Sequence, residues 1–105
     1  MHQITPSGLK EKLDSDEELQ LIDVREPIEH ENYNIGGTLL PLSEIFDGKN
    51  LIKTDIPVII YCKMGIRSQI AIQRLQEKFG FTNLINLQGG IERWKKEIDT
   101  STDKV

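Results

Sequence analysis

The chain has a single cysteine, Cys62, and it stands between an apolar run and a helical pattern. The run before it, IPVIIYC at residues 56–62, is rich in β-branched residues, and the loop that follows reads CKMGIRS. Gly65 supplies the positive φ that a short strand-to-helix turn needs. Backbone N–H groups and the positive end of the next helix then form an anion-binding turn that favours the cysteine thiolate. The pattern predicts a nucleophile, with Lys63 and Arg67 adding positive charge.

The competing interpretation is a structural cysteine packed under a sheet, since free cysteine is among the most buried residue types. The glycine and the two cations beside Cys62 favour the reactive interpretation. One cysteine forms no internal disulfide and has no second thiol to resolve it, so any exchange requires an outside acceptor. His2, His30 and Cys62 lack the paired spacings of metal-binding loops, so we expect no metal and no cofactor.

Hydrophobic patterning predicts strands that alternate with helices. Strands are expected at residues 19–25, 56–62 and 82–88, with a short extended piece within 35–42. Helices are expected from Thr5–Pro6 to residue 13, at 26–33, 68–80 and 89–98, with helical turns after Ser43. Strands apolar on both faces between helices predict a parallel sheet covered on both sides, with ligands at the carboxyl ends of its strands. Asp23, Arg25 and Cys62 stand at such ends.

Length and composition limit the kind of protein. With 105 residues, one domain spanning 1–105 is the simplest organisation, and the polar segment at about 99–105 is expected to fray. The net charge of −4 and the lack of a clustered basic surface argue against a nucleic-acid partner. No apolar stretch is long enough for a signal peptide or a membrane span, so we expect no membrane partner and a cytoplasmic location.

Three motifs in order resemble the rhodanese-like family. They are LIDVREPIEH at 21–30, CKMGIRS at 62–68 and LQGGIERWKK at 87–96, so the resemblance covers essentially the whole chain. It implies an α/β, rhodanese-like three-layer fold, with a mostly parallel five-stranded sheet and helices on both faces. It also implies a sulfurtransferase whose cysteine carries sulfane sulfur as a persulfide.

The resemblance gives the site residues expected roles. The Cys62 thiolate would attack the outer sulfur of a donor such as thiosulfate and keep that sulfur as a persulfide. The terminal sulfur would be held by the backbone amides of a binding loop made of Lys63, Met64, Gly65, Ile66 and Arg67. Lys63 and Arg67 would attract anionic donors, or be solvated surface cations.

Four further residues are expected to have structural roles or no role in the site. Asp23 and Arg25 are expected to form an ion pair that braces the loop, because half-buried charges require partners, although a catalytic part for Arg25 stays open. Ser68 is expected to cap the following helix. His30 lies in a charged segment and is expected to be exposed.

Two other functions use a related fold. Tyrosine phosphatases place five residues between cysteine and arginine, whereas four separate Cys62 from Arg67, and a single sulfur fits the smaller loop. A non-catalytic partner-binding or redox-sensing module is the other alternative. The acceptor is left open among cyanide, a thiol and a sulfur-carrier protein. The segment YNIGGTLLPLSEI, with Asn34 at the family's histidine-like position, resembles domains linked to sulfur-carrier activation, so such a carrier or its activating enzyme is a possible partner.

Overall fold

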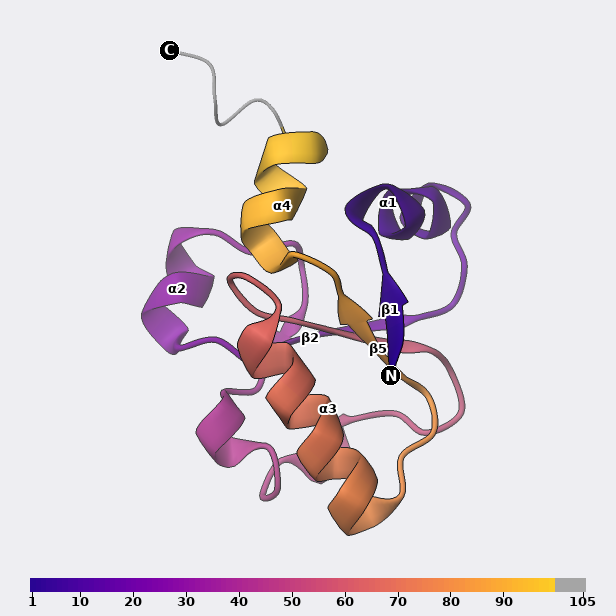
Figure 1. Ribbon diagram of the computed structural model, residues 1–105, viewed down its shortest axis with the longest axis vertical. Helices are drawn as coiled ribbons and strands as arrows, with labels where there is room; N and C mark the ends of the chain where they lie inside the picture. Colours follow the sequence, from indigo (N-terminus) through magenta and orange to yellow (C-terminus); the bar gives the residue numbers. More distant parts are fainter. Residues whose placement is uncertain (100–105) are drawn as a thin grey trace.

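The computed structural model describes residues 1–99, which form a central sheet with helices on both faces (Figure 1). The strands are β1 (His2–Ile4), β2 (Gln20–Asp23), β3 (Thr38–Leu39), β4 (Val58–Tyr61) and β5 (Leu84–Leu87). The helices are α1 (Pro6–Asp14), α2 (Pro27–Asn32), α3 (Ile66–Phe79) and α4 (Gly90–Glu97), with 3₁₀ turns at Leu42–Glu44 and Lys49–Leu51. The predicted α/β fold is confirmed.

The five strands lie in the order β1-β5-β4-β2-β3, and each neighbouring pair is parallel. β4 is central, and all four of its residues are buried, as expected for a strand covered on both faces. Asp23 of β2 pairs with Tyr61 of β4, so the chain leaves both strands at the same edge of the sheet. This edge brings Asp23 next to Cys62.

Side-chain alternation along the strands produces two cores. One lies on the α3 side and includes Ile60, Cys62 and Leu75. The other lies between the sheet and helices α1 and α4, and includes Tyr61 and Trp94. Figure 1 shows α1 and α4 on one face of the sheet and α3 on the other. Cys62 therefore faces the layer that contains the helix following it.

Local sequence signals account for the boundaries of several elements. The Thr5 hydroxyl accepts a hydrogen bond from the Gly8 N–H at 3.1 Å and Pro6 is the first residue of α1, as the sequence predicts. The sequence did not predict β1, a three-residue strand that exists through its pairing with β5. Three residues are too few to show a period, so only the sheet itself identifies this strand.

The chain is anchored up to its last described residue. Tyr33 donates a hydrogen bond from its hydroxyl to Oδ2 of Asp99 at 2.7 Å. Residues 100–105, the rest of the segment expected to fray, lie outside the described residues. Within residues 1–99, no helix has the length and apolar character needed to cross a membrane.

Candidate functional site

Cys62 directly follows β4 and is 1% exposed. Its sulfur is a hydrogen-bond acceptor for two backbone groups, the Gly65 N–H at 3.1 Å and the Ser68 N–H at 3.4 Å. Gly65 has φ +92°, the left-handed conformation expected of it, and is the residue before α3. Hydrogen bonds donated to a sulfur stabilise negative charge on it, so the geometry suits a thiolate.

The carbonyl groups of the loop point toward α4. The carbonyl oxygens of Cys62 and Lys63 accept hydrogen bonds from the N–H groups of Ile91 and Glu92 at 2.9 and 3.0 Å. In a planar trans peptide the next N–H points the opposite way, so the amides of Lys63 and Met64 face away from α4. Within residues 1–99 neither amide has a hydrogen-bond acceptor. The loop thus presents free donors on its side away from α4.

A double-glycine turn makes this contact possible. Gly89 and Gly90 have φ +79° and +60°, and a Cβ at Gly90 would lie 2.5 Å from the carbonyl oxygen of Cys62. A Cβ at Gly65 would in turn lie 3.2 Å from the Gly89 nitrogen. The two turns therefore pack backbone to backbone, and a side chain at Gly90 would push them apart.

Asp23 is the centre of a buried polar brace beside the loop. Arg25 donates from Nε to Oδ1 and from Nη2 to Oδ2 of Asp23, at 3.0 and 2.9 Å, and from Nη2 to the Tyr33 carbonyl. Burial lowers the pKa of Arg25, but the hydrogen bond and charge of Asp23 outweigh it and raise the pKa above its ordinary value. The ion pair expected from the sequence is present, and its fixed geometry suits a structural role.

His30 corrects an expectation, because it is not simply exposed. Its Nδ1 lies 2.8 Å from Oδ2 of Asp23, and 22% of its side chain is accessible. The six-residue helix α2 returns the chain toward β2 and places the imidazole there. His30 therefore completes the Asp23 brace. The sequence did not predict this contact, because the charged residues on both sides of His30 are typical of an exposed segment.

Ser68 also differs from its expected role. Helix α3 begins at Ile66 after Gly65, so Ser68 lies inside the first turn and the predicted cap is wrong. The hydroxyl lies 3.4 Å from the Cys62 sulfur and donates to Oδ1 of Asn86 at 2.5 Å. Asn86 is fully buried and donates to Gln3 of β1 at 3.0 Å. Ser68 thus links the Cys62 sulfur to Asn86 and Gln3 through buried polar contacts.

Arg67 is paired across the site. Its guanidinium donates from Nη1 and Nη2 to the two carboxylate oxygens of Glu29 at 2.7 and 2.8 Å. The hydrogen bond from Arg67 lowers the pKa of Glu29 to about 2. Lys63, Met64 and Ile66 are exposed around the loop. Glu29, which lies 38 residues from Arg67 in the chain, was not predicted as part of the site from the sequence.

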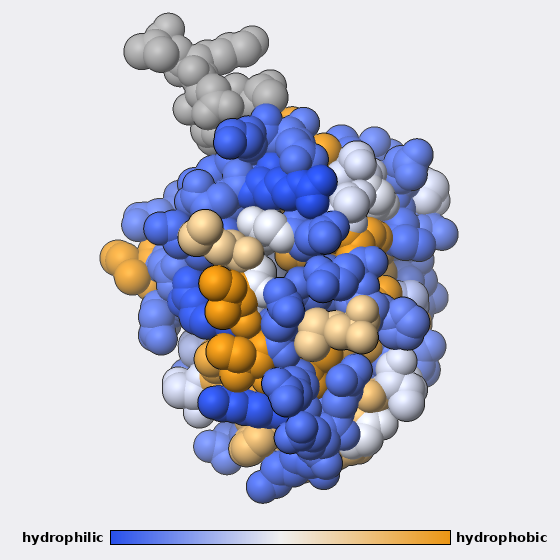
Figure 2. All heavy atoms as spheres, viewed as in Figure 1, coloured by the Kyte–Doolittle hydropathy of each residue, from blue (hydrophilic) through white to orange (hydrophobic). Residues whose placement is uncertain are grey.

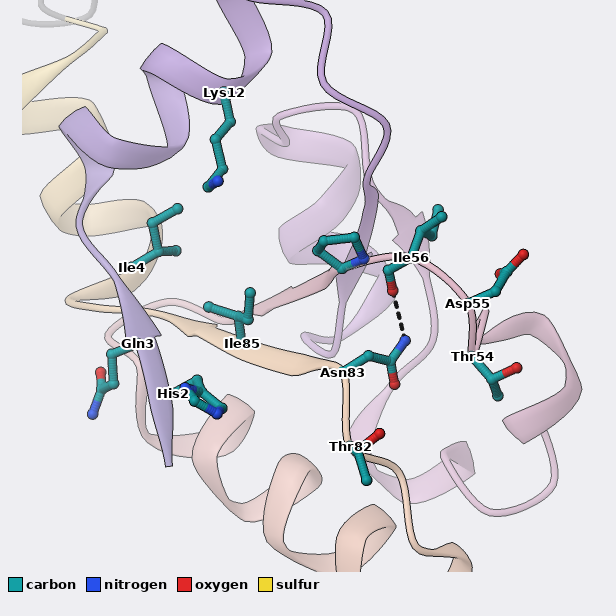
Figure 3. Close-up of a pocket in the computed structure, with 11 residues that line it drawn as sticks. His2, Gln3, Ile4, Lys12, Thr54, Asp55, Ile56, Thr82, Asn83 and Ile85 are labelled. Carbon is teal, nitrogen blue, oxygen red and sulfur yellow. Dashed lines mark hydrogen bonds between the residues drawn. The ribbon is translucent and has the colours of Figure 1, made fainter.

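A groove elsewhere on the protein is unrelated to this chemistry. Figure 3 shows it beside β1, where Asn83 donates to the carbonyl oxygen of Ile56 at 2.7 Å. The residues before β4 and β5 line it, whereas Cys62 follows the opposite, carboxyl end of β4. Among residues 1–99, no three His, Cys, Asp or Glu side chains are placed to bind one metal ion.

The candidate site therefore consists of one cysteine at the carboxyl edge of a parallel sheet, with its sulfur bound by backbone N–H groups of the loop and the helix that follow it. The chain belongs to the Rhodanese-like domain family, whose sequence profile matches residues 5–97. A rhodanese-like domain protein of Staphylococcus aureus superimposes with a TM-score of 0.81 at 30% identity, covering 90% of this chain and 91% of the other. The family membership implied by the three motifs is therefore confirmed.

Sequence relatives include proteins named for sulfur transfer. The chain is 43% identical over 98 residues to the probable adenylyltransferase/sulfurtransferase MoeZ of Mycobacterium tuberculosis, covering 90% of this chain and 25% of MoeZ. It is 48% identical over 80 residues to the protein YqhL of Bacillus subtilis, covering 75% of this chain and 63% of YqhL. The chain thus spans a quarter of the first relative and under two thirds of the second. It is a rhodanese-like domain related to sulfurtransferases.

Removing the charge of Asp23 is expected to destabilise the fold. In an Asp23→Asn variant, Arg25 keeps its charge while only 4% exposed and loses its ionic partner, at a cost of about 3–5 kcal/mol. Urea unfolding measures this free energy. Asp14→Asn is the matched control, since it breaks the exposed pair with Lys10 and changes stability by at most about 1 kcal/mol. Equal free energies of unfolding for the two variants would show that the Asp23–Arg25 pair does not stabilise the fold.

Gly90→Ala is expected to disturb the loop itself. The new Cβ displaces the carbonyl of Cys62, so the amides lose their alignment with the sulfur. The second-order rate constant for loading Cys62 with sulfur from thiosulfate then falls, and iodoacetamide alkylation of Cys62 at a fixed neutral pH changes with it, because the N–H groups no longer hold the sulfur in place. Gly36→Ala is the control, since Gly36 has φ +93° with no atom within 4 Å of a Cβ. Loading and alkylation rates unchanged by Gly90→Ala would contradict the proposed contact.

Proposed function

We propose that this protein is a sulfurtransferase that carries sulfane sulfur as a persulfide on Cys62. The observation that supports this most is the sulfur of Cys62 accepting two backbone N–H groups in a loop with further free amides. In the first half-reaction the thiolate attacks the outer sulfur of a donor. With thiosulfate, a new S–S bond forms at Cys62, the S–S bond of thiosulfate breaks, and sulfite leaves with the electron pair.

The loop then stabilises the product. The terminal persulfide sulfur carries negative charge, and the amides of Lys63, Met64, Ile66 and Arg67 have no acceptor within residues 1–99. Preorganised N–H groups aimed at a developing charge lower its energy in the way an oxyanion hole does. No general base is required, since the nucleophile reacts as the thiolate.

The second half-reaction returns the cysteine to its resting form. A nucleophile such as cyanide or a thiol attacks the terminal sulfur, and the Cys62 thiolate leaves with the electron pair. With a single cysteine in the chain, the acceptor is another molecule. A sulfur-carrier protein or its activating enzyme is the macromolecular partner we propose, since MoeZ is named as both adenylyltransferase and sulfurtransferase. A reducing compartment such as the cytoplasm suits this chemistry.

Two alternatives fit the geometry less well. A redox-sensor cysteine often stands next to a resolving cysteine, whereas Cys62 is the single cysteine of the chain. A phosphatase loop must surround a tetrahedral phosphate, and the four residues between Cys62 and Arg67 make a loop too short for that. The Arg67 guanidinium, which would bind the phosphate, is already bound by Glu29. We therefore place no phosphate in this loop.

Intact mass spectrometry tests the proposal directly. After incubation with excess thiosulfate and removal of the donor, wild-type protein is expected to gain the mass of one sulfur atom, which cyanide then removes as thiocyanate. Cys62→Ser gains nothing under the same conditions, because serine forms no persulfide. If thiosulfate and a small hydropersulfide both leave the mass of folded, reduced protein unchanged, Cys62 is not a sulfur carrier.

A further inference from the structure

Glu29 is held in a fixed position beside the loop. Its Oε1 accepts hydrogen bonds from the Glu26 N–H at 3.0 Å and from Nη1 of Arg67, while its Oε2 accepts from Nη2 of Arg67. Glu29 thus joins the start of α2 to the start of α3. Because the Arg67 hydrogen bond lowers the pKa of Glu29 to about 2, the carboxylate is ionised throughout the neutral pH range.

This pairing changes the charge that an incoming donor meets. Glu29 occupies the two parallel N–H groups with which arginine binds oxyanions, and it cancels the guanidinium charge. The carboxylate of Glu26 also acts on Arg67. A doubly charged donor must therefore displace a carboxylate or bind beside it, within the roughly 10 Å over which charges act at 0.1 M salt. Lys63 is the exposed cation left at the loop.

Exposed apolar side chains stand in the loop and on α2 and α3 beside it. Ile28, Met64 and Ile66 are 63%, 62% and 65% exposed, on α2, in the loop and at the start of α3. Figure 2 shows apolar atoms at the surface over the start of α3, among charged side chains. Apolar side chains make no favourable contact with a small dianion, but they can pack against the organic part of a larger donor.

We propose that Glu29 is a specificity-determining residue that selects hydropersulfide donors over dianionic donors such as thiosulfate. This inference rests on the proposed sulfur transfer through Cys62. With a hydropersulfide, the Cys62 thiolate attacks the outer sulfur of the protonated donor and the S–S bond of the donor breaks. The new Cys62 persulfide then releases its proton to solvent and becomes the anion that the loop amides would hold. The donor leaves as a thiolate with the electron pair, so the step needs no oxidant and places no second negative charge beside Glu29.

The test compares two donors on two variants. Glu29→Gln removes the charge and keeps an oxygen that can accept from the Glu26 N–H. Glu31→Gln removes the same charge from an exposed position on the same helix that has no ion pair among residues 1–99. The donors are thiosulfate and the hydropersulfide of N-acetylcysteine methyl ester, which has no charge besides its persulfide group. Quenched-flow mass spectrometry gives the second-order rate constant of sulfur loading for each pair.

Glu29→Gln is expected to raise the thiosulfate-to-hydropersulfide ratio of these rate constants about tenfold, because Arg67 becomes available to the dianion. Glu31→Gln leaves the ratio unchanged. The gain in Glu29→Gln shrinks in 0.5 M NaCl, since salt screens the interaction of exposed charges. Glu29→Ala, which removes the charge by a different change in shape, is expected to shift the ratio in the same direction.

Two other results overturn the inference in distinguishable ways. If wild-type protein takes up sulfur from a donor and both Glu29 variants, folded by circular dichroism, keep the wild-type ratio, Glu29 does not select the donor and the proposed function stands. The same holds if both rate constants rise equally. If wild-type protein takes up sulfur from neither donor, the proposed function fails and this inference fails with it.

Discussion

The site depends on the contact between the cysteine loop and the beginning of α4. Two N–H groups of α4 bind the carbonyls of Cys62 and Lys63, and the planarity of the peptides then turns the following amides away from α4. The helix thereby uses N–H groups that a helix end leaves unpaired, and the loop acquires a defined orientation. Gly90 permits this approach, since a Cβ there would meet the Cys62 oxygen at 2.5 Å. The motif LQGGIERWKK and the motif CKMGIRS are therefore one structural unit.

Two ion pairs lie beside this unit, on the side of α2. Asp23 compensates Arg25 in the interior, and Glu29 compensates Arg67 at the surface. Helix α2, which begins with Pro27, contacts both pairs, because its Glu29 binds Arg67 and its His30 contacts Asp23. The donors that contact the sulfur are consequently backbone N–H groups. The guanidinium of Arg67 is bound by the Glu29 carboxylate. The arrangement suits the single sulfur of the proposed persulfide better than a large oxyanion.

The sequence predicted the parts of the site that depend on neighbouring residues. The strand that ends at Cys62, the positive φ of Gly65 and the Asp23–Arg25 pair all follow from local patterning and chemistry. Contacts between distant segments were not predicted. Glu29 looked like one more charge on an exposed helix, and its partner lies 38 residues away. Asn86 gave a weak signal, a polar residue within the apolar strand LINL, but only the fold shows that it bonds Ser68.

The central claim is that the loop amides hold the outer sulfur of a Cys62 persulfide. A high-resolution crystal structure of the persulfidated protein tests it most directly. The account predicts electron density for a second sulfur bonded to Sγ of Cys62 and within about 3.5 Å of the free N–H groups between Lys63 and Arg67, a typical upper limit for such contacts. A terminal sulfur directed away from the loop, with no N–H group within that distance, would contradict it.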